Sequence, residues 1–355
     1  MTHPALQTRF TELVGIQHPI VQTGMGWVAG PRLVAATANA GGLGIIAGAT
    51  MSLEQLTAAV REVKDRTGNP FGVNLRADAP DALDRAEMLI KEGVKVASFA
   101  LAPDKALIQR LKDAGVVTMP SVGAKRHAEK VASWGVDAVI VQGGEGGGHT
   151  GSVPTTLLLP SVVDAVGDQL CVVAAGGFFD GRGLVAALAY GAQAVAMGTR
   201  FLLTKDSTVG DSVKDVYLQT PVTGTVVTTQ VDGVPHRVLR TELVDKLEKA
   251  RGPRKYTNAA RNALRFKKES GTPWSAIVRE GLSMKKTHEL SWSQVIMAAN
   301  TPMLLKASMV DGRPDLGIMS TGQVVGLIEE LPTVAELIDR IMSQAEQTLT
   351  RLGGA

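Results

Sequence analysis

VIVQGGEGGGHTGS, the stretch from Val139 to Ser152, joins a strand to a loop with the composition of a binding site. Val139 to Val141 form a short apolar run that is typical of a buried strand. Five glycines then lie between Gln142 and His149, and glycine lets a backbone approach a flat or phosphorylated ligand closely because it has no Cβ. An imidazole at the end of such a loop is suited to carry a proton near pH 7. The stretch alone leaves a second interpretation open, a flexible surface turn whose histidine is only hydrogen-bonded.

This strand is one of eight short apolar runs that alternate with helical patterns up to about residue 200. Strands spaced in this way, each followed by a helix, indicate βαβ units and a parallel sheet. Eight units are the number that closes a barrel, so the sequence favours an α/β fold of the (β/α)8, or TIM barrel, type over an open doubly wound sheet. The predicted strands are Pro19–Gln22, Leu43–Ala47, Phe71–Leu75, Val94–Phe99, Val116–Pro120, Ala138–Gln142, Leu170–Ala175 and Gln193–Met197.

The chain divides into three predicted parts. Residues 1–204 form the barrel. Residues 205–300 carry more charge and more helical patterns, such as Thr241–Ala250 and Tyr256–Glu269, and are predicted to form a smaller, mainly helical insert over the C-terminal face of the barrel. Residues 301–355 return to the barrel with a Gly-rich loop at 319–326 and a final amphipathic helix. The predicted buried face of that helix is Val334, Leu337, Ile338, Ile341 and Leu349.

The composition fits a cytoplasmic protein with a large apolar core. Apolar residues make up 45% of the 355 positions and aromatic residues only 4%, a balance that suits Val- and Ile-rich parallel strands. The single Cys171 excludes an intramolecular disulfide and fits a reducing cytosol. The N-terminus lacks a signal-peptide pattern, and no run approaches the roughly 18–20 apolar residues of a membrane span. We therefore expect no membrane partner.

Charge is distributed unevenly along the chain. The net charge of +3 is too small to indicate nucleic acid as a partner. Between Arg237 and Glu289, however, 14 Lys and Arg stand against 6 Asp and Glu, a local excess of +8. Such an excess indicates an anionic partner for this segment.

In a barrel the reactive groups lie on loops at the carboxyl ends of the strands, and the Gly-rich segments fall there. Gly176-Gly177 and Gly198-Thr199 follow the last two strands, and paired backbone N–H donors at such positions form a phosphate cradle. The amides of Asn74 and Gln142 suit the polar edge of a flavin or a similar ring. Ordinary βα turns and structural amides are the alternatives at each position. No metal is expected.

Seven ordered motifs cover nearly the whole chain and together resemble one family. They are PIVQTGMG (19–26), NAGGLGIIAG (39–48), PFGVNL (70–75), QGGEGGGHTG (142–151), AAGGFFDGRG (174–183), GAQAVAMGTRF (191–201) and STGQVVG (320–326). The sequence resembles the nitronate monooxygenase (2-nitropropane dioxygenase) family, whose superfamily also includes the FMN-dependent enoyl-acyl-carrier reductases of some bacteria. This resemblance implies a TIM barrel that holds FMN without a covalent bond, with His149 as the active-site histidine. By motif, the implied flavin-binding positions are Gly24, Met25, Asn74, Gln142, Gly176, Gly177, Gly198, Thr199 and Gln323.

The basic segment has no counterpart that nitronate chemistry demands, since a nitroalkane anion needs a single positive contact. The chain further resembles an actinobacterial branch of the superfamily, flavin oxidoreductases of steroid-ring degradation that act on indane-type CoA thioesters. This implies hydride exchange between a transiently bound NADH or NADPH and a CoA thioester, whose phosphates would meet Arg251, Arg254 and Lys255. Oxidation of alkyl nitronates with O2 is the second hypothesis. A non-catalytic flavin-binding barrel and a phosphosugar isomerase are further alternatives, and a homodimer is a possible assembly.

Overall fold

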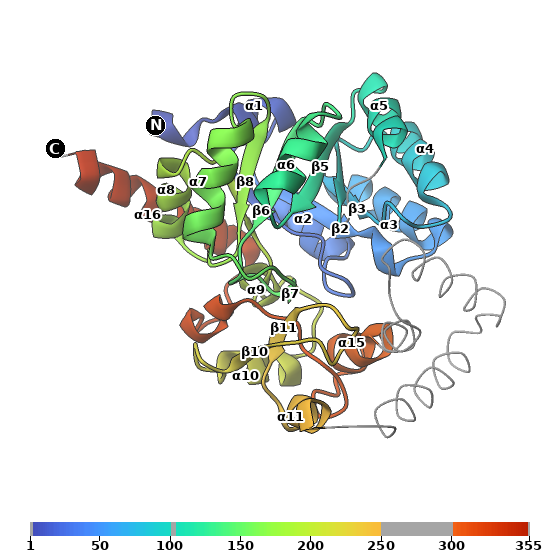
Figure 1. The fold of residues 1–355 in the computed structure, drawn as a ribbon, viewed down its shortest axis with the longest axis vertical. Helices are drawn as coiled ribbons and strands as arrows, with labels where there is room; N and C mark the ends of the chain where they lie inside the picture. The colour runs from blue at the N-terminus through green and yellow to red at the C-terminus, as the bar shows by residue number, and fades with distance from the viewer. Residues whose placement is uncertain (1–2, 101–103, 250–300, 354–355) are drawn as a thin grey trace.

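The computed structural model describes residues 3–100, 104–249 and 301–353. Its centre is a closed barrel of eight parallel strands, in which the first strand pairs with both the second and the last (Figure 1). Every predicted strand is present, with ends that differ by no more than two residues, so the predicted (β/α)8 fold is confirmed. The strands are β1 (Ile20–Gln22), β2 (Leu43–Ala47), β3 (Gly72–Leu75), β4 (Val96–Phe99), β5 (Val117–Val122), β6 (Ala138–Gln142), β8 (Cys171–Ala175) and β9 (Ala194–Met197).

Helices surround the barrel, one between each strand and the next. They are α2 (Pro31–Asn39), α3 (Leu53–Arg66), α4 (Ala82–Glu92), α5 (Lys105–Asp113), α6 (Lys125–Ala132), α7 (Thr155–Val166) and α8 (Gly181–Ala189). The short helices η1 (Pro4–Leu6) and α1 (Arg9–Val14) precede β1, and η2 (Gly48–Thr50) follows β2. Local signals fix several helix ends: Ser52 and Gln55 form a capping box on α3, and Asp180 accepts a hydrogen bond from Gly183 N at the start of α8.

The last helix, α16 (Val334–Gly353), takes the eighth place in the ring although it lies far beyond β9 in the sequence. It packs against α8 and α2, as the predicted return to the barrel requires. Gly181 permits this contact, because a Cβ there would overlap the backbone oxygen of Ile341. Of the predicted buried face, Leu349 is only half-buried, and Val334, Leu337, Ile338 and Ile341 are buried.

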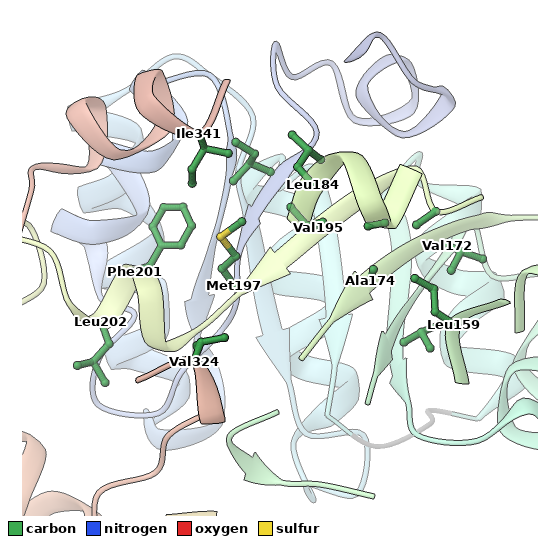
Figure 2. Close-up of a cluster of buried hydrophobic side chains, with 14 of the residues drawn as sticks. Leu159, Val172, Ala174, Leu184, Val195, Met197, Phe201, Leu202, Val324 and Ile341 are labelled. Atoms are coloured by element: carbon green, nitrogen blue, oxygen red, sulfur yellow. The ribbon is translucent and has the colours of Figure 1, made fainter. Parts of the chain in front are cut away.

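A large apolar cluster ties this closing helix to the barrel wall. Phe201 is fully buried beside Met197 of β9 and Ile341 of α16 (Figure 2). Cys171 is a buried free thiol in β8 and packs within the barrel core. In the part of the chain that the structure describes, no helix is both long and apolar enough to cross a membrane.

Between β9 and α16 the chain builds a second lobe around a three-stranded sheet, seen below the barrel in Figure 1. The strand order is β10 (Thr225–Thr228), β11 (His236–Leu239) and β7 (Gly148–His149), so the barrel contributes one edge strand. The surrounding helices are α9 (Thr199–Leu202), α10 (Asp211–Leu218), α11 (Glu242–Lys249), α15 (Thr301–Met309) and η3 (Gln323–Leu327).

The helix predicted at Thr241–Ala250 is present as α11, whereas the one predicted at Tyr256–Glu269 lies outside the described residues. The sheet was not predicted. Its hairpin has a recognisable signal, since Asp232-Gly233 separates two runs rich in β-branched and apolar residues. The exact boundaries of the insert stay a prediction.

Candidate active site

The inward-facing positions of the barrel change character toward the carboxyl ends of the strands. Deeper in the barrel they are apolar and buried, as at Val96 and Ile140. Since side chains alternate along a strand, the positions two residues further on also face inward. These outermost positions are small or polar: Thr23, Ala47, Asn74, Ser98, Ser121, Gln142, Ala175 and Gly198. Asn74 Nδ2 donates to Ser98 Oγ over 3.4 Å. We call this layer the polar floor.

The implied flavin-binding positions after β1, β3 and β9 lie together at this floor. Gly24 faces Asn74 closely, since a Cβ on Gly24 would lie 2.6 Å from Asn74 Cβ. A Cβ on Gly198 would lie 3.2 Å from Thr23 Oγ1 and 3.4 Å from Met25 Sδ. The glycine-containing turns after β1 and β9 and the carboxyl end of β3 thus lie against one another.

The remaining implied positions continue this ring of contacts. Thr199 Oγ1 accepts a hydrogen bond from Gly322 N (2.9 Å), and Gln323 N donates to Glu145 O (3.0 Å). After β8, Gly176 and Gly177 have φ angles of +93° and +87°, a backbone conformation that favours glycine. The late loop at 319–326, which carries Gln323, therefore lies between the turn after β9 and the loop after β6, and the contact of Gln323 with a flavin stays a prediction.

The glycines after β6 serve chain packing as well as ligand access. A Cβ on Gly147 would overlap the backbone of Thr321, and one on Gly143 would overlap Thr155. Gly148, with φ of +71°, has nothing within 4 Å of its Cβ position. The density of glycine, which we interpreted as room for a ligand, is thus explained in part by neighbouring backbone.

Two side chains of this loop hold it in shape. Glu145 Oε2 accepts hydrogen bonds from Thr155 N (2.9 Å) and Thr155 Oγ1 (2.7 Å), which anchors the loop to the start of α7. Gln142 Nε2 donates to His149 O over 2.8 Å. The amide nitrogen of Gln142 therefore supports the loop that carries His149, and its contact with a flavin stays a prediction.

His149 lies on the short strand β7, whereas the sequence predicted it at the end of a loop. β7 pairs with β11 in antiparallel register, so that His149 stands opposite His236. Arg237 of β11 fastens the same loop, since its Nη2 donates to Gly144 O over 2.9 Å. The insert lobe thus fixes the orientation of the predicted catalytic histidine.

His149, Asp232 and His236 form a compact cluster at this junction. His149 Nε2 lies 2.7 Å from Asp232 Oδ2, and His236 Nδ1 lies 3.5 Å from the same oxygen. The two imidazole rings are 4.7 Å apart between centroids and inclined by 55°. Asp232 and His236 are buried, whereas 61% of the His149 side chain is exposed. The cluster presents one accessible imidazole on a buried carboxylate.

Burial and neighbouring charges act in opposite directions on Asp232. Burial raises the pKa of the Asp232 carboxyl, but contact with His149 and His236 outweighs it and holds that pKa well below 3.8. Asp232 is therefore an anion at neutral pH and can only accept hydrogen bonds. His149 Nε2 consequently carries the hydrogen of the 2.7 Å bond, which leaves the lone pair of the neutral ring on Nδ1. Burial lowers the pKa of His236, which favours the neutral form of its imidazole.

Sequence reasoning found His149 but missed its partners. Asp232 is 83 residues away in sequence, and only the pairing of β7 with β11 brings it to His149. The overlooked hairpin signal at Asp232-Gly233 would have placed both Asp232 and His236 at one turn. The predicted contacts of Arg251, Arg254 and Lys255 with CoA phosphates lie outside the described residues.

A closed (β/α)8 barrel with a polar floor and an accessible imidazole on a buried carboxylate defines a cofactor-binding barrel enzyme. The chain belongs to the nitronate monooxygenase family, whose model matches residues 7–344, and it is an oxidoreductase. The resemblance drawn from the seven motifs is thereby confirmed.

Individual relatives cover nearly the whole chain. The chain is 64% identical to the (3aS,4S,5R,7aS)-5-hydroxy-7a-methyl-1-oxo-octahydro-1H-indene-4-carboxyl-CoA dehydrogenase of Mycobacterium tuberculosis H37Rv, over 96% of each protein. It is 62% identical to the enzyme of the same name from Rhodococcus jostii RHA1, over 98% of each. Among solved structures, FabK from Thermotoga maritima is 34% identical with a TM-score of 0.78, covering 98% of this chain and 99% of that one.

Proposed function

We propose that the protein is an FMN-dependent oxidoreductase that exchanges hydride between NAD(P)H and a steroid-derived indane-carboxyl-CoA thioester. The observation that carries the proposal is the accessible His149 imidazole, hydrogen-bonded to the buried Asp232 beside the polar floor. Identities of 64% and 62% to two hydroxy-indene-carboxyl-CoA dehydrogenases support the substrate class. The nicotinamide partner, a homodimer and a cytoplasmic location belong to the same proposal.

The polar floor fits a flavin. Asn74, Ser98 and Gln142 offer amide and hydroxyl groups to the polar edge of a ring, and Gly198 leaves open the space that a Cβ would fill beside Thr23 and Met25. Backbone N–H groups at the turns after β8 and β9 would hold the phosphate. When bound, FMN supplies a centre that accepts and releases hydride. The residues that would hold it are Gly24, Met25, Asn74, Gln142, Gly176, Gly177, Gly198, Thr199 and Gln323.

His149 has the geometry of a proton carrier for such a reaction. Oxidation of a secondary alcohol removes a proton from oxygen as hydride leaves carbon, and we assign that proton to Nδ1 of His149. The resulting imidazolium lies 2.7 Å from the Asp232 carboxylate, whose charge stabilises it. In the reverse direction the same nitrogen returns the proton. The buried carboxylate thus selects the tautomer of His149 and lies beside the charge that the ring acquires in this step.

The first test is anaerobic stopped-flow mixing of the purified enzyme with NADH, NADPH and the CoA thioester, following the loss of flavin absorbance. We expect a nicotinamide and the thioester each to change the redox state of the flavin. His149→Ala should keep the yellow colour and lose turnover by roughly 10²- to 10⁴-fold. His127→Ala, at an exposed position on α6, is the matched control and should behave as wild type.

Two results would redirect the assignment. Flavin bleaching by an alkyl nitronate alone, with no response to NADH, NADPH or the thioester, would make the protein a nitronate monooxygenase, in line with the family name. Loss of flavin together with activity in His149→Ala would show that His149 supports the cofactor and does not carry the proton.

A further inference from the structure

We propose that His149, Asp232 and His236 bind one divalent transition-metal ion, with Zn²⁺ as the best fit, and that this ion inhibits the enzyme. One ligand atom from each residue lies within 4.8 Å of the other two. Two imidazole nitrogens and a carboxylate oxygen form a donor set that Zn²⁺ accepts readily and that Mg²⁺ and Ca²⁺ do not favour. Metal binding requires only these side chains, whereas the inhibition rests on the proposed function of His149.

The buried half of this site is already spaced for a metal. His236 Nδ1 and Asp232 Oδ2 are 3.5 Å apart. Two donors that each lie about 2.0–2.1 Å from a tetrahedral Zn²⁺ are roughly 3.3 Å from one another. His236 is only 3% exposed, and its buried Nδ1 makes no hydrogen bond of normal geometry, since its contact with Asp232 Oδ2 is a long 3.5 Å. Such an atom calls for an explanation, and a metal between it and Asp232 supplies one.

Further hydrogen bonds hold both buried ligands in place. His236 Nε2 lies 2.7 Å from Ser320 Oγ, which leaves Nδ1 as the nitrogen that faces Asp232. Asp232 Oδ1 accepts a hydrogen bond from Val234 N (3.1 Å), so Oδ2 is the oxygen directed at the two histidines. Metal-binding histidines almost always use their second ring nitrogen in this way. The two buried ligands therefore need little rearrangement.

His149 completes the site as the adjustable ligand. Its Nε2 lies 2.7 Å from Asp232 Oδ2, closer than two donors of one Zn²⁺, so it must withdraw by a few tenths of an ångström. Its side chain is 61% exposed and has room to do so. When the metal takes Nε2, the hydrogen of the neutral ring moves to Nδ1. That is the nitrogen assigned to proton transfer, so the metal-bound enzyme has no base for the reaction.

The test is calorimetric titration of Zn²⁺ into the flavin-loaded enzyme, freed of metal by EDTA and dialysis, together with turnover at each Zn²⁺ concentration. We expect one Zn²⁺ per chain in wild type and in the surface control His127→Ala. Asp232→Asn and His149→Ala should each weaken binding by more than the roughly 10- to 100-fold expected for Ser320→Ala, which removes only the supporting hydroxyl. EDTA should restore turnover, and Mg²⁺ should have no effect. Because His149 is exposed, His149→Ala tests the site even if Asp232→Asn folds poorly.

The possible failures are distinguishable. Equal Zn²⁺ affinity in wild type, Asp232→Asn and His149→Ala would overturn the site, and so would the absence of binding to wild type. If Zn²⁺ does not bind while His149→Ala abolishes turnover, the metal site fails and the proposed function stands. If Zn²⁺ binds as expected and turnover is unchanged, the inhibition fails together with the role of His149 on which it rests.

Discussion

Asp232 fixes which nitrogen of His149 is free, through the 2.7 Å bond to Nε2. Asp232→Asn keeps the shape of the side chain but removes the charge that stabilises a protonated His149. An amide can also turn its NH2 group toward Nε2, which would leave the wrong tautomer. We expect kcat to fall by roughly 10²- to 10⁴-fold with the flavin retained. Steady-state kinetics checks this, with Asp113→Asn on the exposed end of α5 as the control. Wild-type kcat in Asp232→Asn would refute the orienting role.

His236 makes stability depend on pH. Its pKa is lowered from 6.5, chiefly by burial, while the neighbouring Asp232 opposes the shift and the neighbouring His149 adds to it. Between the lowered pKa and 6.5 the unfolded chain binds more protons than the folded one, so stability falls as pH drops through this window and recovers above 6.5. Asp232, whose pKa is lowered from 3.8, loses its contribution only at more acidic pH.

His236→Asn removes this titration and keeps an amide near the position of Nδ1. We expect the thermal midpoint of the variant to change less between about pH 7 and pH 5 than that of wild type. Circular dichroism melts across this range measure it. Parallel pH profiles for the two proteins would contradict a buried neutral His236.

At the scale of elements, the packing of the β6 loop against the late loop decides where His149 lies. A Cβ on Gly147 would overlap the Thr321 backbone and lie 2.6 Å from Gly322 N. Backbone atoms cannot move aside without distorting the late loop. We therefore expect Gly147→Ala to lower the free energy of unfolding by about 1–3 kcal/mol and to reduce turnover. Gly68→Ala is the control, since no atom lies within 4 Å of its Cβ position. Urea denaturation of both variants makes the comparison, and equal midpoints would rule out the tight contact.

Local sequence patterns predict the barrel strands but not the three-stranded sheet. Barrel strands such as Ala138–Gln142 were predictable because buried parallel strands are local apolar runs with glycine-rich ends. The turns after β8 and β9 were predictable for the same reason. The sheet of β7, β10 and β11 was missed because its strands are short and its pairing joins residues more than 80 positions apart. A local pattern does not predict the pairing of β7 with β11, and only the Asp232-Gly233 turn signal indicates the hairpin of β10 and β11.

At the scale of the whole molecule, the candidate active site is shared between two parts of the chain. The barrel supplies His149, and the chain between β9 and α16 supplies Asp232, His236 and Arg237. The same stretch carries the basic excess of +8 between Arg237 and Glu289. The chain between β9 and α16 therefore carries both the partners of His149 and the charge suited to the proposed polyanionic substrate.

This charge leads to a prediction for substrate binding. CoA carries several phosphate charges, and hydrogen bonds between charged groups contribute roughly 1.5–3 kcal/mol each. Replacing Arg251, Arg254 and Lys255 together by Ala should raise the KM for the CoA thioester by roughly tenfold or more, with kcat nearly unchanged. Raising the salt concentration should also raise the KM of wild type for the thioester, because salt screens these charges. The same change should raise the KM of the variant less, because the variant lacks the three charges.

A matched triple variant separates this local effect from net charge. Lys125, Arg126 and Lys130 are exposed on α6, and replacing them by Ala removes the same charge from the outer wall of the barrel. We expect the KM for the thioester to stay at its wild-type value in this control. Since NADH has a pyrophosphate but lacks the additional phosphate group of CoA, its KM should change less than that of the thioester in either variant. An equal rise in thioester KM for both triples would mean that the long-range field of the protein attracts the substrate, and that the three residues make no direct contact with its phosphates.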